Sequence, residues 1–188
     1  FYEQMSAFFN LVTMASVGVF TPLGKRVKPG GAFGPCAMCS REAYFRTGGH
    51  QGVKGRVVED VHLAKQFLRQ GLPVRCEAGR RILSFRMYPE GWRQLVEGWS
   101  KGMGYGAFSV NPIFSLLAAV WVTGCFEAMF ALLKAPSSLP SATPMEAGIV
   151  VYLLYAATIW WMLKGIGRFK WWAAALFPLP LVFFALIM

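Results

Sequence analysis

The sequence predicts an α/β segment of about 109 residues followed by three hydrophobic helices in a membrane. Helix and strand patterns alternate in the first segment, as they do in α/β proteins. Charge is concentrated there, because residues 1–109 hold 15 of the 19 Lys and Arg and 7 of the 9 Asp and Glu. The remainder contains three apolar runs, each long enough to cross a bilayer.

The elements of the first segment follow from local patterns. Residues 7–20 are apolar for about 14 residues, too few to cross a hydrocarbon core of about 30 Å, so we expect a buried or interfacial helix. Residues 21–34 are rich in Pro and Gly and predict a loop. Residues 57–71 have helical spacing and end on Gly71, which can close a helix. Residues 72–76 and 82–88 predict short strands.

An amphipathic helix is predicted after Pro89. Its apolar stripe contains Trp92, Leu95, Val96, Trp99 and Met103. Such a helix suits the lipid headgroup layer, but a helix packed on its own domain would have the same pattern, and both interpretations stay open.

Three membrane spans are predicted near residues 111–133, 147–163 and 171–188. Cations lie before the first span and between the second and third, so the positive-inside rule places the soluble segment in the cytoplasm. We therefore expect a multi-pass protein of the inner cell membrane. Glu127 lies inside the first span, where a carboxylate is costly; it either has a function or sits near the outer end without one.

The positive net charge limits the kinds of binding partner that we expect. The chain carries a net charge of +10, most of it in residues 1–109, which suits anionic lipid headgroups or a phosphate-bearing substrate. No nucleic-acid-binding motif is present, and we expect no nucleic acid partner. The pair Cys36 and Cys39 lacks further ligands at the spacing of a zinc site, so no metal site is predicted from it.

The start of the chain suggests a piece of a longer protein. Phe1 opens directly into FYEQMSAFFNLV, without an initiator Met, a basic n-region or a secretory cleavage site. We expect further residues upstream.

Asp60 is the only aspartate in the chain, and Glu59 precedes it. At the start of a predicted helix, such an acidic pair commonly stabilises the helix dipole. Its context suggests more, because several motifs occur in one order: Ala32-Phe33-Gly34-Pro35, Ser40-Arg41-Glu42-Ala43-Tyr44, Gly48-Gly49-His50, Glu59-Asp60-Val61-His62-Leu63-Ala64, Arg86-Met87-Tyr88-Pro89-Glu90-Gly91-Trp92 and Glu97-Gly98-Trp99-Ser100-Lys101.

With these motifs, most of the chain resembles the acceptor half of a family-2 glycosyltransferase of the GT-A fold. In particular it is similar to the bacterial carotenoid-type enzymes, whose FYE, AFGP, GGH, FRMY and EGW elements have counterparts here. The resemblance implies that residues 1–109 form the acceptor side of a cytosolic glycosyltransferase domain with an interfacial helix, and that residues 110–188 are its membrane anchor.

The implied reaction moves a sugar, with inversion, from a nucleotide diphosphate sugar to a lipophilic acceptor. The catalytic residues would be Asp60, as general base, and Glu59. The substrate-binding residues would be Gly34, Gly48, Gly49, His50, Arg86, Trp92, Trp99 and Lys101. The resemblance also implies Mg²⁺ or Mn²⁺, held by a D-x-D motif that these 188 residues lack, so this part alone is expected to be inactive.

The acceptor decides what Asp60 does. A hydroxyl acceptor needs a base, whereas the carboxylate of an apocarotenoid is already ionised near neutral pH. In that second case Asp60 would orient the sugar, and Arg86 could hold the acceptor carboxylate.

Other functions stay open. Processive relatives carry a Q-x-x-R-W motif, but here Gly98 precedes Trp99, which argues against a processive polysaccharide synthase. The acceptor could instead be a hopanoid or a polyprenyl phosphate. A non-catalytic lipid-binding membrane module is the remaining alternative, with Glu59 and Asp60 only capping a helix.

Overall fold

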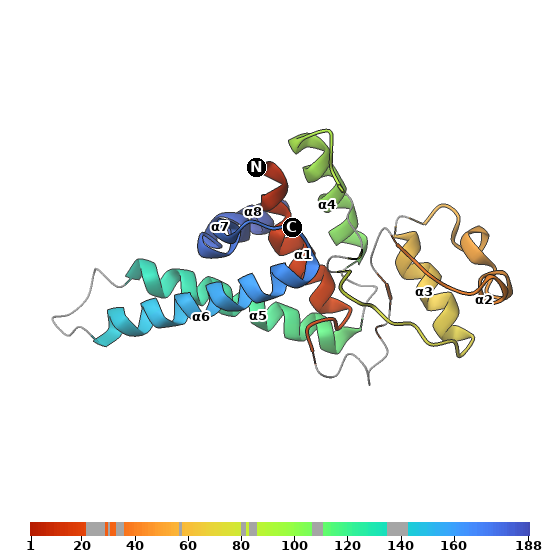
Figure 1. Ribbon diagram of the computed structural model, residues 1–188, viewed down its shortest axis with the longest axis horizontal. Helices are drawn as coiled ribbons and strands as arrows, with labels where there is room; N and C mark the ends of the chain where they lie inside the picture. Colours follow the sequence, from red (N-terminus) through yellow and green to blue (C-terminus); the bar gives the residue numbers. More distant parts are fainter. Residues whose placement is uncertain are drawn as a thin grey trace.

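The computed structural model describes residues 1–21, 29, 31–32, 36–56, 58–79, 82, 86–106, 111–134 and 143–188. Within these residues every regular element is a helix (Figure 1). The elements are η1 (Tyr2–Ser6), α1 (Ala7–Ser16), α2 (Arg41–Arg46), η3 (Gly49–Val53), α3 (Glu59–Arg69), α4 (Trp92–Gly106), α5 (Pro112–Lys134), α6 (Thr143–Ile166), α7 (Trp171–Ala175) and α8 (Pro178–Ile187).

The prediction of an α/β half-domain was wrong for the part of the chain that the structure describes. Residues 72–76 have no regular structure, and of residues 82–88 the described ones, 82 and 86–88, form no strand. An extended segment becomes a strand only when a neighbour completes its hydrogen bonds, and Pro73 lacks an N–H. The apolar alternation of Leu72 and Val74 instead serves packing, because both lie against the cluster formed by Leu63 and Phe67 of α3.

The small α2–η3–α3 lobe is held by that cluster, which also includes Val53. Figure 1 shows α2 and α3 together at one end of the molecule. Gly71 ends α3 with a φ of +74°, and the N–H of Leu72 bonds back to the carbonyl of Phe67 at 3.0 Å. The predicted helix and its glycine stop are therefore confirmed.

Helices α5 and α6 form a long antiparallel hairpin (Figure 1). Glycines let the two helices approach: a Cβ at Gly148 would lie 3.2 Å from the carbonyl oxygen of Ala131, and one at Gly124 would collide with the ring of Tyr155. Among the described residues these are the two helices long and apolar enough to cross a membrane, over Pro112–Leu132 and Glu146–Ile166.

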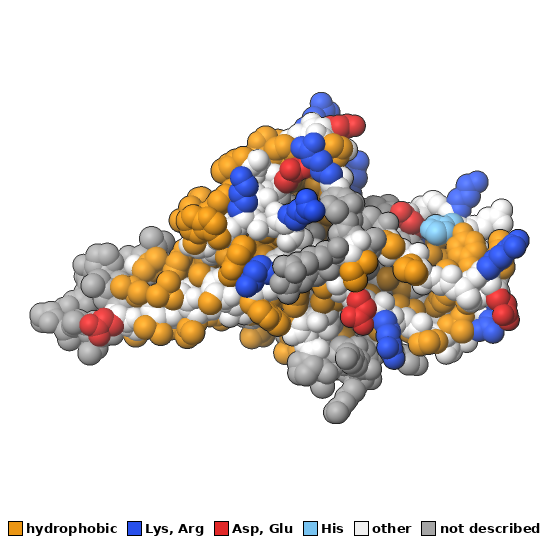
Figure 2. Space-filling model, viewed as in Figure 1, with side chains coloured by type: hydrophobic (Ala, Val, Ile, Leu, Met, Phe, Trp, Pro, Cys, Tyr) orange, Lys and Arg blue, Asp and Glu red, His pale blue; other side chains and the backbone are white. Residues whose placement is uncertain are grey.

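The outer faces of this hairpin are apolar and exposed, which suits contact with lipid (Figure 2). The exposed large side chains on α5 and α6 are Ile113, Leu116, Leu117, Val120, Phe130, Ile149, Val150, Val151, Leu153, Leu154 and Trp161. Glu127 is exposed on α5, within the first candidate span.

The third predicted span, residues 171–188, was wrong. This stretch forms two short helices, α7 and α8, because Pro178 and Pro180 lack the N–H groups that a continuous helix would need. The ten residues of α8 reach only about 15 Å, half of a hydrocarbon core. Both helices bury one face in the protein, through residues such as Ala173 and Ala174 of α7 and Leu181 of α8.

Helix α1 lies at the centre of the main core, as expected of a buried helix. Phe8, Phe9 and Leu11 are fully buried. The helix contacts α5, α6 and α8, so the N-terminal segment packs against the hairpin and its neighbours. Burying three such side chains contributes roughly 1.5–3 kcal/mol each to the free energy of unfolding.

Helix α4 confirms the predicted apolar stripe and packs on protein. Leu95 and Trp99 are buried, and the Trp99 ring stacks on Phe9 with 5.0 Å between ring centroids. The helix contacts η1 and α8. Trp92 is 45% exposed at the start of the helix, so the stripe is buried most deeply in its middle.

Candidate functional site

The predicted site residues fall into two groups in the described part of the chain. Asp60, Glu59, Gly48, Gly49 and His50 belong to the α2–η3–α3 lobe. Arg86, Trp92, Trp99 and Lys101 belong to α4 and the segment before it, which packs on η1 and α8 (Figure 1). Gly34 lies outside the described residues.

Asp60 and Glu59 occupy the first turn of α3. The half-buried Asp60 carboxylate accepts a hydrogen bond through Oδ1 from the N–H of Val61 at 2.8 Å, whereas Glu59 is exposed. Free N–H groups and the helix dipole favour a carboxylate at this end. The interaction fixes the orientation of the Asp60 side chain.

His62, one position further on, is surrounded by positive charge. Partial burial lowers its pKa from the ordinary value of 6.5, and Arg56, Lys65 and Arg69 lower it further, while Asp60 opposes them. The neutral imidazole is thereby favoured on this face of α3.

The glycines of the Gly48-Gly49-His50 motif make a turn after α2. Their φ angles are +84° and +50°, a region that side chains other than glycine rarely adopt. A Cβ at Gly49 would lie 2.6 Å from the Tyr44 ring. The turn places His50 against Tyr44, whose hydroxyl oxygen lies 2.7 Å from His50 Nδ1 and accepts the backbone N–H of His50 at 3.1 Å.

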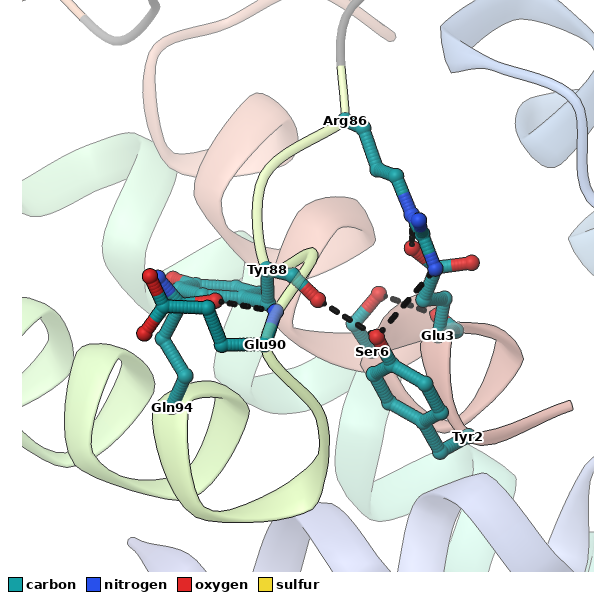
Figure 3. Close-up of polar contacts among 7 residues, drawn as sticks. All are labelled: Tyr2, Glu3, Ser6, Arg86, Tyr88, Glu90 and Gln94. Atoms are coloured by element: carbon teal, nitrogen blue, oxygen red, sulfur yellow. Dashed lines mark hydrogen bonds and ion pairs between the residues drawn. The ribbon is translucent and has the colours of Figure 1, made fainter.

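Arg86 lies in the second group, where it is held by the N-terminal segment (Figure 3). Its Nε donates to Oε1 of Glu3 in an ion pair, and Nη2 donates to the hydroxyl oxygen of Tyr2 at 3.4 Å. Tyr2 in turn donates to the carbonyl oxygen of Tyr88 at 2.6 Å. The FYE and FRMY motifs therefore meet in space, although Glu3 and Arg86 are 83 positions apart.

These contacts hold the guanidinium of Arg86 at a partly exposed surface. The hydrogen bond and charge of Glu3 raise the pKa of Arg86 above its ordinary value, so the guanidinium stays positive. Burial raises the pKa of Tyr88, which keeps the phenol neutral. The arrangement can present a fixed cation to an anionic ligand.

The EGW motif has a packing role in the structure. A Cβ at Gly98 would collide with the ring of Tyr88, so glycine lets this ring lie against α4. The Tyr88 and Trp99 rings then meet edge to face at 5.9 Å. The side chain of Lys101 is exposed, while Trp99 is 3% exposed and lies in the core.

The role of the N-terminal segment could not be assigned from single motifs. Phe1 stacks on Trp172 at 5.1 Å, and Gln4 Oε1 accepts the backbone N–H of Lys170 at 2.6 Å. With Tyr2 and Glu3, four consecutive residues hold segments that are remote in sequence. The FYE likeness was visible, but the pairing of this segment with residues 86–88 and 170–172 needed the fold.

Among the described residues, no group of three or more His, Cys, Asp or Glu side chains could hold a metal ion. Cys36 and Cys39 are exposed thiols.

The whole chain is similar in sequence to bacterial glycosyltransferases. These relatives are the 4,4'-diaponeurosporenoate glycosyltransferases of Staphylococcus aureus: those of strains MRSA252 and USA300 are each 32% identical to the chain over all 188 residues, which cover 49% of each relative. The chain thus spans about half the length of the curated relatives it matches. No family model matches it, and no solved structure does.

The resemblance to carotenoid-type glycosyltransferases that the motifs indicated is confirmed by this similarity. It extends through both site groups and the α5–α6 hairpin, since the match covers every residue of the chain.

Proposed function

We propose that the chain is part of a membrane-bound glycosyltransferase that transfers a sugar from a nucleotide diphosphate sugar to an apocarotenoid carboxylate. The observation that carries this proposal is the 32% identity over all 188 residues to enzymes named for diaponeurosporenoate. The product would be a glycosyl ester. Two helices of the chain that are long and apolar enough to cross a membrane support an acceptor that is dissolved in lipid.

Asp60 is proposed to act at the reacting sugar, with inversion at the anomeric carbon. The bond from the Val61 N–H holds its carboxylate in place. Toward a hydroxyl acceptor Asp60 would remove the proton, a contribution of roughly 10²–10⁴ in rate. Toward a carboxylate acceptor no proton has to leave, and Asp60 would orient the sugar instead.

Arg86 is proposed to bind the carboxylate of the acceptor. The guanidinium has five N–H donors, and the contact with Glu3 uses the Nε donor. Fixed by Glu3 and Tyr2, the remaining edge is preorganised for a carboxylate. The exposed Lys101 would add positive charge near the donor phosphates.

We propose that Mg²⁺ or Mn²⁺ neutralises the donor diphosphate, bound by a D-x-D motif that the 188 residues do not contain. The residues of this chain would then contribute the acceptor side of the reaction.

We propose further that α5 and α6 span the inner membrane with the remaining helices on the cytoplasmic side. The exposed Cys36 and Cys39 offer a test. An impermeant maleimide should label them only after cells are permeabilised, while a cysteine introduced at Ser138, between the two spans, should react in intact cells. Labelling of Cys36 and Cys39 in intact cells would contradict the proposed orientation and indicate the opposite one.

Two acceptors test the role of Asp60. In the complete gene product, Asp60→Asn should lower turnover about 10²–10⁴-fold with a hydroxyl acceptor and much less with the apocarotenoid carboxylate. Glu59→Gln changes the exposed residue next to Asp60. With the hydroxyl acceptor it should lower turnover less than Asp60→Asn does. An equal, large loss with both acceptors would contradict the two roles, and near-full turnover with both would remove Asp60 from the chemistry.

A further inference from the structure

The hydroxyl of Tyr44 bonds two groups of His50 at once. It accepts the backbone N–H of His50, which fixes the start of η3, and it lies 2.7 Å from the ring nitrogen Nδ1. The two rings lie 5.6 Å apart between centroids. Because Nδ1 is engaged by the phenol, Nε2 is the nitrogen through which the exposed imidazole can bind a ligand.

The direction of the hydrogen bond between Tyr44 and Nδ1 determines which nitrogen of His50 carries the proton. A neutral imidazole has one N–H and one acceptor nitrogen, and a phenol has one proton to donate. When Tyr44 donates that proton to Nδ1, the imidazole proton is on Nε2. His50 then presents the Nε2–H group on its exposed edge, where it can donate a hydrogen bond to an anionic oxygen.

The surroundings favour an anion. Lys54 and Arg56 follow η3 directly and are exposed, and η3 packs on α3, which carries Asp60. Arg56 is close enough to α3 to lower the pKa of His62. Figure 2 shows Lys and Arg atoms, with some Asp and Glu atoms between them, on the surface of this end of the molecule.

We infer that Tyr44 is a positioning residue that holds His50 with Nε2–H directed to an anionic oxygen of a reactant. This inference rests on the proposed function. The oxygen belongs either to the diphosphate of the donor or to the carboxylate of the acceptor, because both present the same acceptor chemistry. The two positive φ angles of Gly48 and Gly49 explain why the motif needs glycines ahead of this histidine.

Three variants of the complete gene product test the inference. Tyr44→Phe removes the hydroxyl and keeps the ring. His50→Gln keeps an N–H donor near the place of Nε2, whereas His50→Asn offers its amide near the place of Nδ1. Tyr152→Phe is the matched control, since it removes a phenol hydroxyl that bonds the carbonyl oxygen of Ala175 in another part of the fold.

The readouts are KM for donor and for acceptor, kcat, and the ¹⁵N spectrum of selectively labelled histidine. Tyr44→Phe should raise one of the two KM values about tenfold to a hundredfold with kcat little changed, as expected for loss of a bond to a charged group. The KM value that rises identifies the reactant. The His50 signal should shift away from the Nε2–H tautomer, His50→Gln should retain a lower KM than His50→Asn, and Tyr152→Phe should match wild type.

Several results would overturn the inference. If wild type transfers sugar and Tyr44→Phe leaves both KM values and the His50 tautomer unchanged, Tyr44 has no positioning role. If Tyr44→Phe only lowers the unfolding temperature while His50→Gln and His50→Asn keep normal KM values, the pair serves the fold alone. Absence of transfer by wild type with every nucleotide sugar would overturn the proposed function itself, and the ligand role of His50 with it.

Discussion

The Nε atom of Arg86 donates to the carboxylate of Glu3, which lies 83 positions earlier in the chain. Both side chains are partly exposed, so the pair is expected to contribute little to global stability. Its consequence is local, because it connects the segment before α4 with the helix η1 (Figure 3).

Breaking this pair should impair acceptor binding more than folding. Arg86→Gln and Glu3→Gln should each raise KM for the acceptor about tenfold or more, and the double variant should be no worse than Arg86→Gln, because Glu3 acts through Arg86. Arg93→Gln is the control, since Arg93 pairs with Glu97 on the exposed side of α4 at 2.9 Å. Additive effects of the two substitutions would show that Glu3 does not act through Arg86.

Substitution of Gly98 should destabilise the protein by steric conflict. Gly98→Ala places a methyl group against the Tyr88 ring and should cost about 1–3 kcal/mol, measured as a fall in unfolding temperature in detergent. Gly102→Ala, one turn along the same helix, has no heavy atom within 4 Å of the new Cβ and should be neutral or stabilising by up to about 1 kcal/mol. Equal effects of the two substitutions would contradict the packing of Tyr88 on α4.

The α5–α6 hairpin should tolerate no side chain at Gly124. Gly124→Ala pushes a methyl group onto Tyr155, with the nearest conflict at the hydroxyl oxygen, so the unfolding temperature should fall. Tyr155→Phe removes that oxygen, and the double variant should recover part of the loss; ring carbon Cζ at 2.9 Å keeps the recovery incomplete. A double variant that is less stable than Gly124→Ala alone would argue against this contact.

The lowered pKa of His62 predicts that α3 is held less firmly in acid. The unfolded state binds a proton near pH 6.5 and the folded state only at lower pH, so stability is fully present above about pH 6.5 and declines as the pH falls through the folded pKa. Because solvent screens this group, the effect should be small, a few-fold at most in amide exchange of α3 between pH 7 and pH 5. His62→Gln should abolish that difference after correction for intrinsic exchange rates, and an unchanged pH dependence would assign it to other groups.

Local sequence patterns predicted the helices well and the tertiary arrangement poorly. The stripe containing Leu95 and Trp99 and the stop at Gly71 follow from residues within one or two turns, so they could be read directly. The strand assigned to residues 72–76 failed because its alternation arises from packing on α3, and a sequence alone does not say which neighbour an extended segment meets. The third span failed because Pro178 and Pro180 divide an otherwise apolar run.

The site was predictable only as a set of motifs. Asp60 at a helix N-terminus and the glycine turn before His50 could be anticipated from residue type. The contacts of Tyr44 with His50 and of Glu3 with Arg86 could not, since each depends on how a turn or a distant segment folds back. The structure places the Trp99 side chain in the core, a packing role that its motif alone did not indicate. Its contact with substrate stays a prediction.

The most direct test of the account is a transfer assay in native membranes. Membranes that contain the complete gene product are incubated with labelled nucleotide sugars and diaponeurosporenoate, and the lipid extract is resolved by mass spectrometry. The account predicts a glycosyl ester of the apocarotenoid, formed only with a divalent metal and reduced in the Arg86→Gln variant. Failure of every nucleotide sugar to label the lipid, with the folded protein present in the membrane, would contradict it.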